Sequence, residues 1–452
     1  MSSGNCTEYS LTDLKKVLII TYYWPPAGGS GVQRWLKFVK YFSKFGIEPV
    51  VYTPENPEMM ARDITLLKDI PQGITVIKRK ILEPYSIYKI LTGKKGESIR
   101  PGFIAGSKDK SSGTLKERVS LFIRSNLFIP DPKCLWISPS VRFLKKYLRK
   151  NPVDLIVSTG PPHSMHLIAR RLAKKTTTPW IADFRDPWTG MYTFKNMLNT
   201  SLATRIHKKL ERAVIREADA VVTVTNGMKA EIEELSPKRI VVITNGFDAD
   251  DYKDISAEQE TKFSITYTGL FVKDRNPSVL WKVLGEKAAR DRRFSEELRI
   301  KIIGYTDKCV PEDILNNGLE KNLYVKNYVS HPEAVRQQQS ARVLLLAGGQ
   351  QPEATAILTG KFFEYLATGN RILAFGPKGG DMDNALIECG AGEMFEYYDY
   401  KGAKEWIDRE YERYLAGTAQ EKPSDIEKYS REKLCKKMSE LIEETILNKR
   451  KL

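Results

Sequence analysis

The sequence predicts an α/β protein made of two successive doubly wound sheets. Short apolar runs rich in β-branched residues recur along the 452-residue chain, and helical patterns separate them. Two of these runs, VLIIT at 17–21 and FSITY at 263–267, each open a series of similar size and precede a glycine-containing loop. A chain of this length exceeds one ordinary core, which favours two domains.

The first series is expected to occupy residues 1–250. Its opening strand leads into the loop YYWPPAGGSG and a helix with one apolar face, which ends at Gly46. Gly28 and Gly29 lie where the loop meets the helix, and they let a phosphate or a sugar approach the backbone closely. The spacing is neither GxGxxG nor that of a phosphate loop, so the glycines alone do not identify a ligand.

The elements that follow continue the alternation of strands and helices. More strands of the first series are expected at 155–158, 180–182, 220–224 and 240–243. The Gly-, Ser- and Lys-rich segment 93–113 predicts an insertion. A polar linker at 249–262 precedes the second series, residues 251–423, and the tail 424–452 predicts one long amphipathic helix. Strands of the second series are expected at 263–267, 298–303, 323–325, 342–347 and 371–375.

The stretch TGKFFEYLATGN at 359–370 predicts a short helix between the strands RVLLLA and RILAF. A helix start that follows a strand presents backbone N–H groups and a positive dipole end to an anion. Lys361 adds a charge in the first turn, and Glu364 lies on the same face. One interpretation is a site for a phosphate at Lys361 and a hydroxyl at Glu364. The other is an ordinary ion pair on a solvated helix.

The amino-acid composition limits the classes of binding partner. The net charge of +16 fits nucleic acid, anionic lipid headgroups or a phosphorylated small molecule. No nucleic-acid-binding motif stands out, and no run of about 18 apolar residues spans a bilayer. The five cysteines lack metal-ligand or redox spacing, and the first residues show no signal peptide, so we expect a cytoplasmic protein.

Lysine and arginine mix with large apolar side chains between residues 116 and 150. A helix of this composition can lie on an anionic membrane surface. The alternative is an amphipathic helix packed on a domain. With the first interpretation, the protein is peripherally associated with the inner face of the cell membrane.

Several segments, in this order, resemble retaining glycosyltransferases of family 4. They are PPAGGSGVQR, ADAVVTVTNGMKAEI, ITNGFD and the series TGL…LRIKIIG…KFFEYLATGNRIL. STGPPHS and PWIADFRDPW resemble members from polysaccharide-making bacteria. The resemblance covers most of the chain. It implies the GT-B fold, in which two Rossmann-like domains face a central cleft and a C-terminal helix crosses back to the first domain. The first domain would hold the acceptor and the second a nucleotide-sugar.

The resemblance also implies site residues. Members of this family need no metal or other cofactor. They place basic residues at the donor phosphates, a tyrosine at the nucleobase and a glutamate at the ribose. Surface lysines and a core tyrosine are the alternatives. With the positions above, the residues expected to bind the donor are Gly28, Gly29, Gly269, Lys273, Arg275, Tyr328, Leu358, Thr359, Gly360, Lys361 and Glu364.

One position departs from the family pattern. The family has two glutamates separated by seven residues, and Glu364 matches the second. The first position holds Ala356, and Glu353 is out of register. Because the first glutamate normally contacts the donor sugar, the sequence does not identify that sugar.

The acceptor side is expected to involve His163, Arg185 and Asp186. His163 follows a strand at the start of a helix, where it can bond the reacting sugar or orient the acceptor hydroxyl. His166 is the second choice, and a capping or packed histidine is the alternative. Arg185 and Asp186 lie among aromatic residues that suit a sugar, although a structural ion pair is equally compatible.

The predicted function is retaining transfer of a sugar to a lipid-linked or growing cell-surface glycan. His163, Lys273 and Glu364 are the expected catalytic residues. Two other functions stay open. A nucleotide-sugar epimerase can use the same fold, and Ala356 is compatible with a non-catalytic nucleotide-sugar-binding protein.

Overall fold

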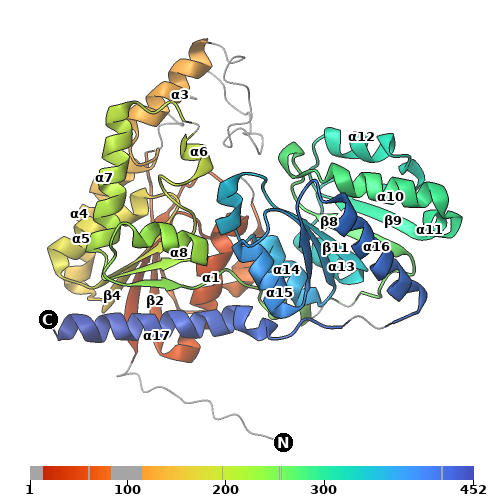
Figure 1. The fold of residues 1–452 in the computed structure, drawn as a ribbon. Helices are drawn as coiled ribbons and strands as arrows, with labels where there is room; N and C mark the ends of the chain where they lie inside the picture. The colour runs from red at the N-terminus through yellow and green to blue at the C-terminus, as the bar shows by residue number, and fades with distance from the viewer. Residues whose placement is uncertain are drawn as a thin grey trace, which may run out of the picture. The chain divides into compact units, whose positions relative to one another are not determined.

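The computed structural model describes residues 14–59, 62–82, 115–195, 197–253, 255, 257–418 and 421–451. The chain forms two compact units (Figure 1). The first unit comprises Met1–Thr244 and Leu434–Leu452, and the second comprises Asn245–Lys433. The insertion expected at 93–113 lies outside the described residues.

The described part of the first unit contains a seven-stranded parallel sheet of order β3-β2-β1-β4-β5-β6-β7. Its strands are β1 (Lys15–Ile20), β2 (Ile47–Pro54), β3 (Thr75–Arg79), β4 (Leu155–Gly160), β5 (Trp180–Phe184), β6 (Ala220–Thr223) and β7 (Ile240–Val242). The strand order reverses between the paired strands β1 and β4. A reversal of this kind creates a ligand crevice outside the carboxyl ends of the two strands.

Helices cover both faces of this sheet. They are α1 (Ser30–Phe42), α3 (Leu115–Leu127), α4 (Ile137–Lys150), α5 (Ser164–Thr176), α6 (Tyr192–Lys195), α7 (Ser201–Glu217), α8 (Asn226–Glu233) and α17 (Arg431–Arg450), with 3₁₀ turns η1 (Ser43–Phe45), η2 (Ile64–Asp69) and η3 (Cys134–Trp136). One core contains apolar residues of α4, α5 and α7. The other contains those of α1 and α17, and the Cys435 thiol of α17 contacts the Phe38 carbonyl of α1. Helix α17 therefore completes the first unit (Figure 1).

The second unit repeats the plan with a six-stranded parallel sheet of order β10-β9-β8-β11-β12-β13 in its described residues. Its strands are β8 (Phe263–Thr268), β9 (Leu298–Ile303), β10 (Leu323–Lys326), β11 (Val343–Ala347), β12 (Arg371–Phe375) and β13 (Gly392–Phe395). The order reverses between β8 and β11. The second ligand crevice is thus expected at the ends of these two strands.

The second unit also has helices on both faces. They are α9 (Asp250–Lys253), α10 (Ser278–Arg290), α11 (Arg292–Glu297), α12 (Cys309–Asn316), α13 (His331–Ser340), α14 (Gly360–Thr368), α15 (Asp381–Cys389) and α16 (Tyr400–Leu415), with 3₁₀ turns η4 (Lys273–Arg275), η5 (Glu320–Asn322), η6 (Pro352–Ala356) and η7 (Ile426–Tyr429).

The predicted fold class is confirmed, since two parallel sheets with helices on both faces are present. The tail differs in detail, because the helix predicted over 424–452 is interrupted. A 3₁₀ turn at Ile426–Tyr429 precedes α17, and Ser430 between them has an extended backbone. No helix among the described residues is long and apolar enough to cross a bilayer.

Candidate functional site

A basic cluster occupies the strand-order reversal of the second sheet. Lys361 lies in the first turn of α14, the helix that follows β11 and η6. Its ammonium donates to the hydroxyl of Tyr267 at 2.6 Å and lies 4.1 Å from the centre of that ring, which belongs to β8. A helix N-terminus and a lysine therefore meet at the carboxyl ends of β8 and β11, where an anion is favoured.

Gly269 makes this position of Lys361 possible. It directly follows β8 with a backbone φ of +101°, a conformation that favours glycine. A β-carbon at residue 269 would lie 2.7 Å from Cε and 2.9 Å from Nζ of Lys361. Only a residue without a side chain leaves this space to the lysine, which explains the glycine that the sequence places after the strand.

The surroundings of Lys361 make its charge sensitive to a ligand. Burial and, to a smaller extent, the charge of Arg275 lower the pKa of Lys361 to about 7, although Glu364 opposes them. Burial raises the pKa of Tyr267 to about 12, so this phenol stays neutral and donates to the carbonyl of Leu270 at 2.6 Å. One ammonium hydrogen of Lys361 goes to Tyr267 and one faces Leu270 at 3.4 Å. The third has no acceptor in the described part of the chain.

Glu364 is held at the same edge of the sheet. Its carboxylate accepts from Nε2 of Gln338 at 3.1 Å, and the same amide donates to the hydroxyl of Thr268 at 2.9 Å. The Glu364 carbonyl accepts from the hydroxyl of Tyr252 at 3.2 Å. The side chain is half-buried. Lys361 and Glu364 thus share one end of the crevice, with opposite charges available to a ligand.

The remaining donor-side candidates spread around this cluster. Arg275 lies beside the Tyr267 hydroxyl and within electrostatic range of Lys361. Lys273, at the start of η4, is exposed, and its backbone amide donates to Asp307 at 2.9 Å. Among the predicted basic residues, Arg275 is therefore the one that the structure brings to Lys361.

Residues before α14 shape its N-terminus. Leu358 is buried, Thr359 is the N-cap, and Gly360 is exposed at the first helical position. The Thr359 hydroxyl oxygen is buried, and no described residue bonds it. Ala356 ends η6, the turn that also contains Glu353.

Tyr328 lies in the loop after β10, two strands from β8. Its side chain is 86% exposed, which excludes the alternative of a core tyrosine. The structure does not bring it to Lys361 through any described contact.

In the first unit, Arg185 joins the loops that follow β1 and β4. Its guanidinium donates to the carbonyls of Gly31 at 2.7 Å, Gly160 at 3.3 Å, and Pro161. It forms no ion pair with Asp186, so that structural alternative is wrong. Arg185 thereby fixes the crevice wall at the strand-order reversal of the first sheet.

Gly28 and Gly29 precede the helix that Arg185 holds. Gly29 has a φ of +96°, and a β-carbon there would meet no atom within 4 Å, so the loop is open at this point. The start of α1 is at Ser30, as the glycine pattern predicted.

Asp186 contrasts with its neighbour. Burial raises the pKa of its carboxyl group, and Arg185 opposes this effect. The carboxylate accepts no hydrogen bond from the described residues. It is thus a half-buried acceptor that a hydroxyl group of a ligand can occupy.

Asp183, which was not among the predicted site residues, has a structural position. Its carboxylate pairs with Arg34 at 2.9 Å and accepts from Trp35 at 2.7 Å and Thr159 at 2.8 Å. Burial alone would raise the pKa of Asp183, but Arg34 and these donors hold it below its usual value. Arg34 also donates to the carbonyl of Thr244, the last residue before the second unit, at 2.8 Å. The pair therefore ties α1 to the centre and the end of the first unit.

His163 and His166 lie side by side above β4. The ring of His163 stacks on Trp188, with centres 4.5 Å apart, and is 8% exposed. His166 is fully buried, and its Nδ1 lies 2.8 Å from the hydroxyl of Ser158. The Nδ1 of His163 and the Nε2 of His166 are buried without a partner in the described residues, and both flank Gly160.

The hydrogen bonds determine where His166 carries its proton. The indole of Trp180 can only donate, and it donates to the hydroxyl of Ser158 at 2.8 Å. The Ser158 hydroxyl then gives its own hydrogen to Nδ1 of His166, since the described residues offer it no other acceptor. His166 therefore holds its proton on Nε2, aimed towards the space beside His163.

We expect His166 to stay neutral, protonated on Nε2, throughout pH 5–8. Burial lowers its pKa to about 3, so the charged form appears only well below that range. Nitrogen-15 NMR of the imidazole groups tests this, because the chain has four histidines. A doubly protonated His166 signal at pH 6, or a Ser158→Ala variant with the same tautomer and pKa, would contradict the assigned hydrogen-bond chain.

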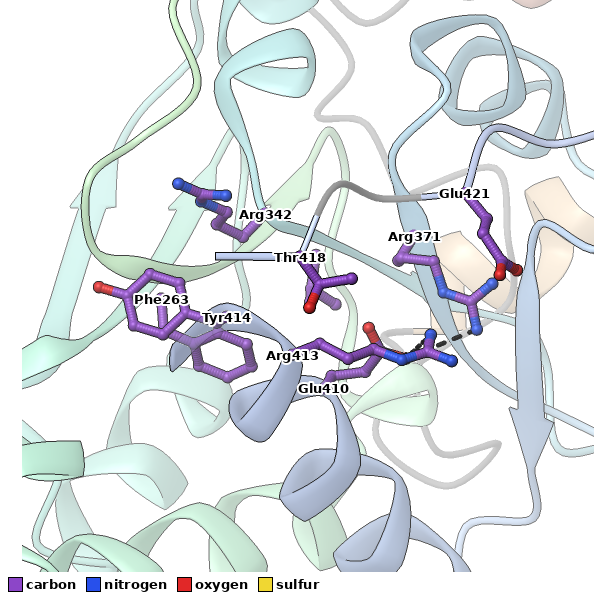
Figure 2. Close-up of a pocket in the computed structure, with 9 residues that line it drawn as sticks. Phe263, Arg342, Arg371, Glu410, Arg413, Tyr414, Thr418 and Glu421 are labelled. Atoms are coloured by element: carbon purple, nitrogen blue, oxygen red, sulfur yellow. Dashed lines mark hydrogen bonds and ion pairs between the residues drawn. The ribbon is translucent and has the colours of Figure 1, made fainter. Parts of the chain in front are cut away.

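A pocket lies at the amino ends of the strands of the second sheet (Figure 2). Phe263, Val343 and Arg371, which line it, are the first residues of β8, β11 and β12. In this pocket Glu410 pairs with Arg371 at 3.6 Å and with Arg413 at 3.1 Å. Because lining residues start their strands, the pocket lies away from the carboxyl ends of the strands, where a ligand is expected to bind.

No group of His, Cys, Asp or Glu side chains suited to a metal ion is found among the described residues.

Comparisons with known proteins agree with this architecture. Residues 104–251 match the model of the family described as Glycosyltransferase Family 4. No curated protein matches the sequence. Among solved structures, the chain is similar to the lipopolysaccharide outer core galactosyltransferase WaaB, with 14% identity and a TM-score of 0.56 over 96% of this chain and 99% of that chain.

Two other structures have the same fold. The complex of an S. aureus TarM variant with fondaparinux, α-GlcNAc-glycerol and UDP has 11% identity and a TM-score of 0.53 over 96% of this chain and 99% of that one. The UDP-GlcNAc 2-epimerase of Methanocaldococcus jannaschii has 12% identity and a TM-score of 0.50 over 95% and 99%. The chain therefore has the GT-B fold, and its residues 104–251 are similar to glycosyltransferase family 4.

Proposed function

We propose that the protein transfers a sugar, with retention, from a nucleoside diphosphate sugar to a lipid-linked or growing cell-surface glycan, without a metal ion. The observation that carries this proposal is Lys361, held by Tyr267 and Gly269 at the N-terminus of α14. In this reaction the bond from the anomeric carbon to phosphate breaks, and the leaving diphosphate gains charge. Preorganised cations and N–H groups stabilise that charge.

The other donor-side residues have roles that follow from their chemistry. Arg275 and Lys273 share the diphosphate with Lys361, together with the Thr359 hydroxyl and the amide of Gly360. Glu364 accepts hydrogen bonds from ribose hydroxyls, because Gln338 holds its carboxylate at the crevice. Tyr328 offers an exposed ring to the nucleobase.

The first unit would bind the acceptor. His163 stacks on Trp188, which fixes the plane of its imidazole, and its Nε2 has no hydrogen-bond partner among the described residues. Asp186 offers an acceptor for a hydroxyl group. Arg185 positions the loop carbonyls that frame the site, and Gly29, which follows Gly28, leaves the backbone open. The new glycosidic bond forms on the face that the phosphate leaves, and the acceptor hydroxyl proton passes to a base.

Nucleotide-sugar epimerisation is the second candidate, because the epimerase of Methanocaldococcus jannaschii has the same fold. An epimerase releases an altered nucleotide-sugar when no acceptor is present, whereas a transferase releases the nucleoside diphosphate. Turnover of either kind excludes the non-catalytic binding protein that Ala356 leaves open.

A thermal-shift panel of nucleoside diphosphates and their sugars tests the proposal. Because the TarM complex contains UDP, uridine compounds come first in the panel. A ligand that binds the folded state raises the melting temperature. The ligands that do so are then incubated with the protein, and their products are identified by mass spectrometry. A panel with no shift and no turnover would overturn the proposal.

Binding of the donor is expected to take up a proton above pH 7. The free protein holds Lys361 with a pKa of about 7, so the amine is mostly neutral at pH 8. A diphosphate favours the ammonium form, which raises this pKa and draws a proton from the buffer. Affinity should accordingly fall as the pH rises from 7 to 9.

Calorimetry at pH 8 in buffers of different ionisation enthalpy measures this uptake. The nucleotide-sugar is the suitable ligand, because its phosphates do not titrate near neutral pH. We expect about one proton taken up at pH 8, little at pH 6, and none in a Lys361→Met variant. An uptake that persists in that variant would assign the proton to another group.

A further inference from the structure

Helix α3 exposes a row of large apolar side chains. Val119, Leu121, Phe122 and Ile123 are each between 40% and 50% exposed, and Leu127 is 72% exposed. Helix α4, from the same basic and apolar stretch, differs, because its apolar residues Val141, Leu144 and Leu148 are buried in the core. Packing on the domain therefore describes α4 but leaves the apolar face of α3 uncovered.

Helix α7 carries a basic stripe. Leu202, Arg205, Ile206, Lys209, Arg212 and Arg216 are all exposed. The four cations among them are three or four residues apart, which places them on one helix face. The acidic residues of this helix do not offset the stripe. Glu211 is buried and accepts from Thr189, and Glu217 is bound by Arg170 and Lys174.

The two surfaces are adjacent. The side chain of Asn126, near the end of α3, donates to the carbonyl of Leu198 at 2.8 Å and accepts from the amide of Thr200 at 2.7 Å. Thr200 is the N-cap of α7, so these bonds hold the end of α3 against the start of α7. Leu127 directly follows Asn126, Leu202 lies two residues after Thr200, and the end of α3 lies beside the start of α7 (Figure 1).

We propose that α3 and α7 form a docking face for an anionic phospholipid surface. The apolar side chains of α3, with Leu202 and Ile206, would enter the boundary between headgroups and acyl chains. Arg205, Lys209 and Arg212 would pair with lipid phosphates. A nucleic acid would use the cations but gives no place to a row of aliphatic and phenyl side chains. The proposal specifies the membrane contact expected for a lipid-linked acceptor, but it does not depend on sugar transfer.

Vesicle sedimentation with the full-length protein tests the docking face. The probes are vesicles of phosphatidylcholine alone and of phosphatidylcholine with about one-third phosphatidylglycerol. The protein is expected to bind the anionic vesicles and not the neutral ones, with weaker binding at high salt. The triple variant Arg205→Glu, Lys209→Glu and Arg212→Glu should lower this affinity by about 100-fold or more.

A second pair of variants separates charge from apolar contact. Phe122→Ser with Leu127→Ser should also weaken binding, and the binding that remains should be more sensitive to salt. The matched control reverses three exposed lysines of the second unit, Lys321, Lys422 and Lys433, and should bind much more tightly than the α7 triple variant.

The donor-induced thermal shift is measured for every variant, so that loss of docking is distinguished from loss of the donor site or of the fold. If the control variant lost as much vesicle affinity as the α7 triple variant, the loss would be due to net charge alone, and the proposal would be overturned. Tighter binding to a DNA duplex than to anionic vesicles would overturn it as well.

Discussion

Replacing Lys361 by methionine is expected to lower sugar-transfer turnover by about 100- to 1,000-fold, the usual cost of removing one preorganised donor to a charged leaving group. The melting temperature should stay the same or rise. Burial of the ammonium is unfavourable, as its lowered pKa shows, and methionine fills the same space beside Tyr267 without a charge. Activity and stability are therefore expected to change in opposite directions.

Steady-state kinetics and thermal unfolding of the same preparations measure the two effects. Lys321→Met is the matched control, since Lys321 is exposed in η5 and should change neither quantity appreciably. Lys273→Met makes an informative third variant, because its side chain is exposed and should cost less activity than Lys361→Met. Equal losses of turnover and stability in Lys361→Met would indicate a structural lysine and remove the main support for the proposed function.

Most strands of the two sheets were predictable because buried parallel strands are continuous apolar runs, but β3 and β13 were not predicted. The glycine after β8 was also apparent in the sequence, but the sequence did not show why a glycine is needed there. Gly269 and Lys361 are far apart in sequence, and only the pairing of β8 with β11 brings them together. The sequence therefore predicted the parts of the donor cluster, whereas the contact with Tyr267 and the closeness of Arg275 depend on the folded sheet.

The acceptor-side motif illustrates a different limit. Asp183, Arg185 and Asp186 lie within four positions, and side-chain chemistry alone does not separate their roles. In the structure, Asp183 is inside strand β5 and faces α1. Arg185 and Asp186 lie beyond the strand end, where one reaches backbone carbonyls and the other has no donor in the described residues. The position of each residue relative to the end of β5 therefore distinguishes roles that the composition of the motif does not.

The basic stretch at 116–150 shows why a sequence pattern does not predict which helix face is exposed to solvent. Helices α3 and α4 have the same kinds of residues, yet only the apolar face of α4 meets the core. The stripe on α7 was not identified, because its cations are interspersed with the buried residues His207, Val214 and Ile215. A tertiary structure is needed to see which of these faces remain outside.

Replacing Asp183 by asparagine is expected to destabilise the protein by about 3–5 kcal/mol, the typical cost of breaking a buried ion pair from one side. Both partners are at most 1% exposed, so in the variant the Arg34 guanidinium is buried without its carboxylate. The folded-state pKa of Asp183 lies below its unfolded value of about 3.9. The carboxylate thus contributes stability above pH 4, and this contribution is lost as the pH falls through the folded pKa.

Urea unfolding of the wild type and of Asp183→Asn from pH 7 to pH 3 measures both aspects. The difference in unfolding free energy should be largest near neutral pH and should shrink below about pH 4, where the carboxyl group of the unfolded wild type begins to take up protons. Glu296→Gln, which breaks the exposed pair of Arg292 and Glu296, is the control and should change stability by less than about 0.5 kcal/mol. An Asp183→Asn variant as stable as this control would show that Arg34 is held by the carbonyls of Ile243 and Thr244 alone, and that the charge of Asp183 does not fix the end of the first unit.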